Sequence, residues 1–223
     1  ALRSRYITAS ELNNLISPKK FEIRKGDDPH SYICRKIAEQ WRGEPLDDGG
    51  SWAMEQGQIL EAEAIPWLEK TLGVDAQRPG FVLNDAEDFG CTPDALFGDT
   101  GAEIKCPQPA NHVKWIIGGC CPSDHFLQVQ GAMYATGAKF WNFVSYCRTF
   151  PTLNVVVPRD ESLMVTIDMA VHLANGVIES GYETLVRLNG GPPQRQCRVP
   201  DGEWEGDPFA TLAGPPLTME VRP

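Results

Sequence analysis

The stretch CTPDALFGDTGAEIK, residues 91–105, holds the residues that decide the fold and the chemistry of this chain. Two segments with strand character, 95–97 and 102–106, are separated by Gly98–Gly101, a pattern typical of a β-hairpin. Asp94 comes directly before the first strand, while Glu103 and Lys105 belong to the second. Side chains alternate between the two faces of a strand, so Glu103 and Lys105 share one face. The hairpin is therefore predicted to bring an Asp, a Glu and a Lys together.

The register of this hairpin determines how the charged side chains meet. A pairing of Phe97 with Ala102 would place Asp94 opposite Lys105, with both side chains on the face of Glu103. Ile104 would point into the core, and its carbonyl would stay free at the strand edge. Carboxylate and carbonyl oxygens suit Mg²⁺ or Mn²⁺, and no nearby His and Cys residues have the spacing of a zinc site. We therefore predict a metal site that activates water beside a phosphate. Two metal ions are the usual arrangement for this chemistry.

The composition fits one domain with a substantial core. The 223 residues include seven cysteines, an odd number without paired spacing, which favours reduced thiols in the cytoplasm. The sequence has no apolar run long enough for a membrane span and no signal peptide, so no membrane partner is expected. A net charge of −10 normally argues against nucleic acid, but a nuclease concentrates carboxylates around its metals and can contact DNA through a local basic strip.

Apolar periodicity and chain breakers predict regular elements along residues 1–189. Thr8–Glu11 has the T-x-x-E capping pattern, which predicts that a helix begins there, and Pro66 can kink a later one. The stretch 190–223 has seven prolines in 34 residues and is expected to be an irregular tail. The further predicted helices are 30–41, 52–72, 124–136 and 161–188, and the strands are 81–83, 95–97, 102–106, 141–147 and 153–157.

Two helical features strengthen the prediction of a site. Glu61 lies in the middle of an apolar stripe, and a buried carboxylate is costly unless it is paired or bound to a metal. Gln130 and Tyr134 are one helical turn apart on one face, where they could lie over the hairpin and bond to the site or to a phosphate. The other members of the stripe are Met54, Gly57, Ile65, Leu68 and Leu72.

These residues resemble the PD-(D/E)XK nuclease superfamily in its RecB-like branch, and within it the phage lambda exonuclease or YqaJ-type viral recombinase family. Five motifs occur in the family's order and cover residues 1 to about 188, whereas the tail from Gly190 falls outside the resemblance. They are Ile7–Glu11, Gly57-x-x-x-Glu61, Cys91–Leu96, Glu103–Pro107 and Gln128–Gln130.

The resemblance implies an α/β fold with the restriction-endonuclease-like core, a central mixed sheet flanked by helices. It also implies a Mg²⁺-dependent exonuclease that digests linear double-stranded DNA in the 5′-to-3′ direction. The products would be 5′-mononucleotides and a long 3′ single-stranded overhang. The family forms a ring-shaped homotrimer around DNA and works with a single-strand annealing protein, so we expect both partners and a phage or prophage origin in a bacterial host.

The resemblance also assigns roles in the active site. Asp94, Glu103 and the carbonyl of Ile104 match metal ligands, and Lys105 matches the catalytic lysine. Glu61 and Gln130 match residues that support the active site. An acidic position upstream of the P-D motif stays unassigned, because four residues compete for it, namely Asn84, Asp85, Glu87 and Asp88.

Other residues are assigned to the DNA end. Arg3 and Ser10 match a pocket for the 5′-phosphate, and Ser10 lies in the first turn of a predicted helix, whose free N–H groups favour an anion. Arg3 can add a bidentate contact. Met54 matches an apolar wedge that separates the DNA ends, and the predicted DNA-binding residues also include Gln128 and Tyr134.

Three alternative interpretations remain at this point. A related endonuclease would use the same site. A Cas4-like nuclease would need four cysteines for an iron–sulfur cluster, and although Cys34 and Cys197 are present, no late C-x-x-C exists. A catalytically silent DNA-binding relative should lack at least one of Asp94, Glu103 and Lys105, and all three are present.

Overall fold

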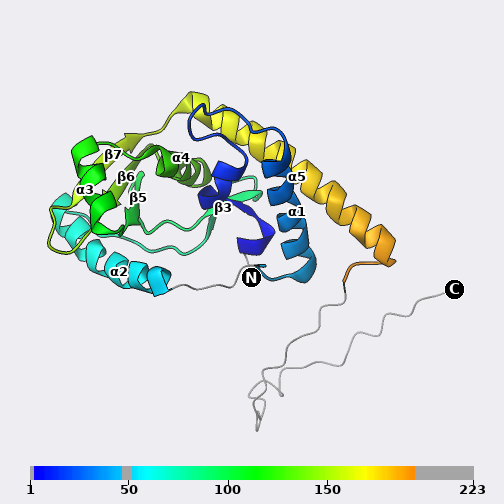
Figure 1. Cartoon of the computed structure of the whole chain (residues 1–223), viewed down its shortest axis with the longest axis horizontal. Coiled ribbons are helices and arrows are strands. Elements are labelled where there is room, and N and C mark those ends of the chain that lie inside the picture. Colours follow the sequence, from blue (N-terminus) through cyan, green and yellow to red (C-terminus); the bar gives the residue numbers. More distant parts are fainter. Residues whose placement is uncertain (1–2, 47–51, 194–223) are drawn as a thin grey trace, which may run out of the picture. The chain divides into compact units, whose positions relative to one another are not determined.

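The computed structural model of the chain describes residues 3–46 and 52–193, without the side chains of residues 52–56 and 58. Its centre is a mixed sheet flanked by helices (Figure 1), so the predicted α/β class is confirmed. Most of the predicted tail lies outside the described residues. No helix in the described part of the chain is long and apolar enough to cross a membrane.

The larger sheet has the strand order β4-β5-β6-β7. Its central pair, β5 and β6, is parallel, and the two outer pairs are antiparallel. One face packs Ile104 and Val144 against Leu68 of α2, and the other packs Trp141 and Phe143 into the main core. The four strands are β4 (Ala95–Phe97), β5 (Thr100–Lys105), β6 (Phe140–Ser145) and β7 (Leu153–Pro158).

The predicted hairpin is present, but its predicted register is wrong by two residues. Phe97 pairs with Thr100 rather than with Ala102, so the turn contains two residues. Gly98 begins this turn with a φ of +58°, a conformation that glycine adopts without steric cost. Gly101 lies in β5. A Cβ atom there would lie 2.3 Å from the Trp141 ring, so the position requires glycine. A shift of two residues keeps every side chain on its face, so the predicted common face is unaffected.

A smaller sheet joins the N-terminal segment to the strand that leads into the hairpin. Its order is β1-β3-β2, with β1 parallel and β2 antiparallel to the central strand. Neither β1 nor β3 was predicted, because each is too short to show alternation. These strands are β1 (Ile7–Thr8), β2 (Val82–Leu83) and β3 (Phe89–Cys91).

Four long helices occur within three residues of their predicted bounds: α1 (Asp27–Arg42), α2 (Trp52–Leu72), α4 (Ser123–Thr136) and α5 (Glu161–Asn189). Pro66 lies inside α2, which continues through it. One helix, α3 (Pro109–Gly118), lies in a stretch for which no helix or strand was predicted.

The helix predicted to begin at Thr8–Glu11 is a 3₁₀-helix and not an α-helix. Ala9–Asn14 forms η2, a six-residue 3₁₀-helix, and a shorter 3₁₀ turn, η1 (Arg3–Arg5), precedes it. The Thr8 hydroxyl donates to the Glu11 carboxylate at 2.9 Å and makes no cap to a backbone N–H group. The predicted capped helix is therefore a 3₁₀-helix without a side-chain cap, and the phosphate-binding role of Ser10 stays a prediction.

Candidate active site

The three charged residues of the hairpin come together as predicted. The Asp94 Oδ2 atom accepts a hydrogen bond from the Ile104 N–H at 2.6 Å, which ties the segment before β4 to β5. The Lys105 Nζ atom lies 2.5 Å from Glu103 Oε1. Glu103 is 4% exposed, so its carboxylate is held inside the protein beside the lysine.

The carbonyl of Ile104 lies on the side of Asp94. The N–H and C=O groups of one strand residue point to the same neighbouring strand. Because the Ile104 N–H points to Asp94, its carbonyl also points away from β6, toward the side where β4 has ended. The Ile104 side chain is buried against α2, as predicted.

The local electrostatics favour the binding of a proton or a cation at this arrangement. Burial, and then the negative charge of Glu103, raise the pKa of Asp94 to about 8. Burial likewise raises the pKa of Glu103, although the nearby Lys105 opposes this. Burial lowers the pKa of Lys105, but Glu103 and Asp94 outweigh it and raise the net value, so the lysine is an ammonium here. Two buried carboxylates thus share one positive charge, which favours the uptake of further positive charge.

Two neighbouring helices contribute to the same centre. Gln128 of α4 donates from Nε2 to Glu103 Oε1 at 2.6 Å. Glu61 of α2 is close enough to raise the pKa of Asp94 and Glu103, and its own carboxylate pairs with Arg78 at 3.1 Å. The Glu61 side chain is 24% exposed and paired, so it is not a buried, unpaired carboxylate within the stripe.

Gln130 and Tyr134 do not lie over the hairpin, contrary to the prediction. The Gln130 side chain is buried, donates to the Pro158 carbonyl at 2.9 Å and accepts from the Asp160 N–H at 3.0 Å. The Tyr134 hydroxyl donates to Asp168 of α5 at 2.8 Å. Residues two apart on a helix point about 200° apart. Gln128 therefore faces the acidic pair, Asp94 and Glu103, and Gln130 faces away from it.

The N-terminal residues predicted to contact the DNA end lie beside the acidic pair. The Arg3 Nη2 atom donates to Ser10 Oγ at 3.3 Å. A small cavity is lined by both residues and extends to Glu103 and Gln128. Thr92 also lines it, and no role was predicted for this residue, which belongs to the motif Cys91–Leu96.

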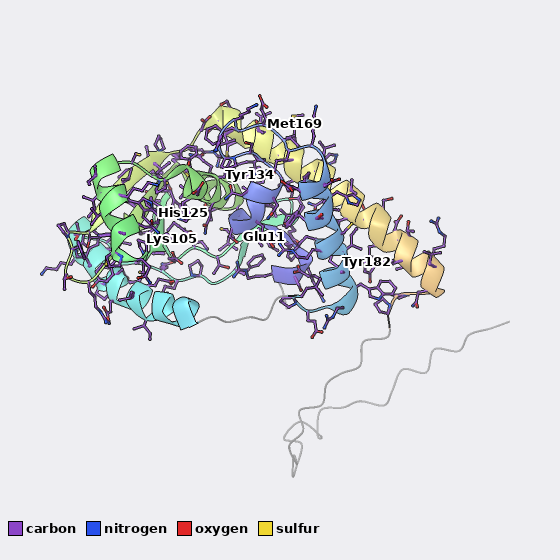
Figure 2. The ribbon with its side chains drawn as sticks, viewed as in Figure 1. Glu11, Lys105, His125, Tyr134, Met169 and Tyr182 are labelled. Carbon is purple, nitrogen blue, oxygen red and sulfur yellow. The ribbon has the colours of Figure 1, made fainter. Side chains whose placement is uncertain are left out.

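His125 is a further neighbour that the sequence did not indicate. Its ring stacks on Phe143 with centroids 5.6 Å apart and meets Trp115 edge-on at 5.2 Å. Burial, and then the positive charge of Lys105, lower the pKa of His125 to about 4, so its imidazole is neutral. Figure 2 shows His125 and Lys105 next to each other.

Two points of the sequence analysis stay predictions. The Met54 side chain lies outside the described residues. The turn of Asn84 and Asp88 is closed by their own hydrogen bond of 2.8 Å and is held to Asn175 of α5 through the Asp88 carbonyl, so the unassigned acidic position stays unassigned.

The donor set of the site fits a hard divalent cation. The described residues contain no group of three or more His, Cys, Asp or Glu side chains that could hold a metal by themselves. Asp94 and Glu103 with one carbonyl supply three oxygens, and Mg²⁺ usually keeps several waters and binds through one or two carboxylates together with phosphate oxygens.

A mixed sheet with an Asp before a hairpin and Glu-x-Lys on its second strand defines a nuclease of the PD-(D/E)XK class. The chain belongs to the YqaJ-like viral recombinase domain family, whose pattern matches residues 1–139. No curated protein matches the sequence.

Solved structures give the same fold. The alkaline exonuclease LHK-Exo from Laribacter hongkongensis superposes with a TM-score of 0.75 at 26% identity, over 85% of this chain and 95% of that one. Its complex with dAMP matches equally well, at the same identity and coverage. The phage-related exonuclease from Haemophilus somnus 129PT gives a TM-score of 0.65 at 15% identity, over 81% of this chain and 96% of that one.

Proposed function

We propose that this protein is a Mg²⁺-dependent exonuclease that digests linear double-stranded DNA from its 5′ ends, releases 5′-mononucleotides and leaves a 3′ single-stranded overhang. The observation that carries the proposal is the buried pair of Asp94 and Glu103, which shares the single ammonium of Lys105. The family, the two exonuclease structures and the dAMP complex of one of them support it.

The residues divide the chemistry between them. Asp94, Glu103 and the Ile104 carbonyl would hold Mg²⁺, or Mn²⁺ in its place, with two ions per site as the expected number. When bound, the metal lowers the pKa of water and neutralises charge on the phosphate. The Lys105 ammonium would donate hydrogen bonds to the attacking water or to a phosphate oxygen. Gln128 and Glu61 hold and tune the acidic pair.

The neighbouring cavity supports digestion from the 5′ end. Arg3 and Ser10 would bind the terminal 5′-phosphate through a charge-assisted contact, and the same cavity reaches Glu103. A terminal phosphate held there places the first phosphodiester bond near the acidic pair. Met54 remains the proposed wedge that separates the DNA ends.

The family assignment supports further partners. We propose a homotrimeric ring that encloses the duplex, which would allow an acidic protein to stay on DNA. A single-strand annealing protein would then take up the overhang for recombination. A phage or prophage origin and a place of action in the bacterial cytoplasm complete the proposal.

Lys105→Ala tests the catalytic part. We expect the variant to lose Mg²⁺-dependent cleavage of a linear duplex by about a hundredfold or more, while its affinity for the duplex in Ca²⁺ changes little. Lys70→Ala is the matched control, because Lys70 is an exposed lysine on α2. Undiminished digestion by Lys105→Ala would remove the proposed mechanism.

A further inference from the structure

A lysine is buried in the middle of α1, away from the acidic pair. Lys36 is 1% exposed, and its Nζ atom lies 3.1 Å from Glu39 Oε2 and 3.6 Å from Glu11 Oε2. The same atom donates to the backbone carbonyl of Arg3 at 3.2 Å. A buried ammonium is costly, and an apolar side chain in place of a buried ion pair is often neutral or stabilising. Stability alone therefore does not explain this lysine.

The contacts of α1 hold the N-terminal segment at two points. One helical turn after Lys36, Gln40 donates from Nε2 to the Arg5 carbonyl at 3.0 Å. The segment between these carbonyls is the three-residue turn η1, and the backbone bond from Tyr6 to Arg3 is long at 3.4 Å. A turn this short gains little from its own hydrogen bonding, so α1 fixes its position.

Glu11 extends this support from α1 to the residues that contact Arg3. Its carboxylate accepts from Tyr32 at 3.2 Å and from Arg35 at 3.1 Å, both on α1. It also accepts from Thr8, whose hydroxyl lies 3.2 Å from Ser10 Oγ. Figure 2 shows Glu11 beside α1. Ser10 in turn accepts the hydrogen bond of Arg3. Lys36 thus contacts the Arg3 backbone directly and is linked to Ser10 through Glu11 and Thr8.

We propose that Lys36 is a positioning residue for recognition of the 5′ end: it holds the Arg3 backbone and Glu11 so that the Arg3 guanidinium stays at the cavity beside Glu103. The inference rests on the proposed function, because it requires that Arg3 and Ser10 receive the terminal phosphate. Lys36 itself does not touch the DNA. Its effect is to keep a long, flexible arginine side chain within reach of the phosphate, which reduces the ordering cost of binding.

The test compares 5′-phosphorylated with 5′-hydroxyl linear duplexes, for which kcat/KM is measured in Mg²⁺. The variant Lys36→Met/Glu39→Leu removes both members of the closest ion pair, so it leaves neither of them buried and unpaired. We expect its preference for phosphorylated ends to fall roughly tenfold through a higher KM, with kcat/KM on hydroxyl ends changed less than about twofold. Lys36→Arg, which keeps the charge, should retain most of the preference.

Arg3→Ala and Gln40→Ala make each outcome decisive. Arg3→Ala should abolish the preference, and Gln40→Ala, which removes only the bond to Arg5, should weaken it by about threefold even if the double variant does not fold. A wild type without any preference would refute the end assignment of the proposed function. If Arg3→Ala loses the preference while Lys36→Met/Glu39→Leu and Gln40→Ala keep it, the positioning role alone is overturned. An equal loss on both kinds of end would show a purely structural role and overturn it too.

Discussion

Replacing Asp94 with Asn should stabilise the metal-free protein in a way that depends on pH. An asparagine keeps a carbonyl oxygen to accept the Ile104 N–H but removes a charge next to Glu103. Burial and Glu103 raise the folded-state pKa of Asp94 to about 8, above the ordinary 3.8. The folded protein therefore binds this proton more tightly than the unfolded chain, so stability is lost as pH rises from about 4 and the loss is complete above about 8.

The size of the effect follows from that pKa difference. At about 1.4 kcal/mol per pH unit, a gap of four units sets an upper bound of roughly 6 kcal/mol at pH 8. The side chain keeps some contact with solvent, and Glu103 and Lys105 share the titration, so we expect about 2–4 kcal/mol. For a chain of this size that corresponds to a rise in Tm of roughly 5–15 °C at pH 8 and almost none at pH 4.

Thermal unfolding in a chelator, at pH values from 4 to 8, measures this difference. Asp99→Asn is the matched control, since Asp99 is a carboxylate in the hairpin turn that is 74% exposed and pairs with the surface residue Lys139. Added Mg²⁺ should raise the Tm of the wild type at pH 8 and leave that of Asp94→Asn nearly unchanged. An Asp94→Asn variant that is less stable at pH 8, or equally stabilised at pH 4, would refute the electrostatic account.

The remaining predictions separate packing from catalysis. Gln130→Ala should lower stability by about 1–3 kcal/mol through two lost backbone hydrogen bonds, with kcat of the folded enzyme unchanged, whereas Gln128→Ala should lower kcat more than tenfold with little change in Tm. Gly101→Ala should lower stability by about 1–3 kcal/mol, because its methyl group would collide with Trp141, and unfolding in denaturant measures it. Gly176→Ala, at an open helical position, should instead raise stability by about 0.5–1 kcal/mol, and the opposite order of the two glycine variants would contradict the packing.

The local patterns of the sequence were sufficient for the long elements and for the hairpin. Apolar periodicity over ten or more residues located α1, α2, α4 and α5, and the turn chemistry around Gly98 located the hairpin. The common face of Asp94, Glu103 and Lys105 followed from alternation alone, which is why an error of two residues in the register did not disturb it.

The remainder depends on contacts between distant segments. The short strand Ile7–Thr8 exists because it pairs with Phe89–Cys91, about 80 residues away, and neither has a period of its own. Gln130 and Gln128 are indistinguishable by composition, and only the side of α4 that packs on the sheet decides which one reaches Glu103. Lys36 is one of many polar residues on its helix, and its burial depends on the N-terminal segment, whose carbonyls are bound by Lys36 and Gln40.

Digestion of end-labelled duplexes in Mg²⁺ decides whether this protein is a 5′-to-3′ exonuclease. A linear duplex labelled at either its 5′ or its 3′ ends, and a closed circular duplex of the same sequence, are each incubated with the wild type and with Lys105→Ala. We predict that the wild type releases the 5′ label first, as a mononucleotide, and leaves the circle intact, and that Lys105→Ala releases neither label. Early release of the 3′ label, or cleavage of the closed circle, would contradict the account.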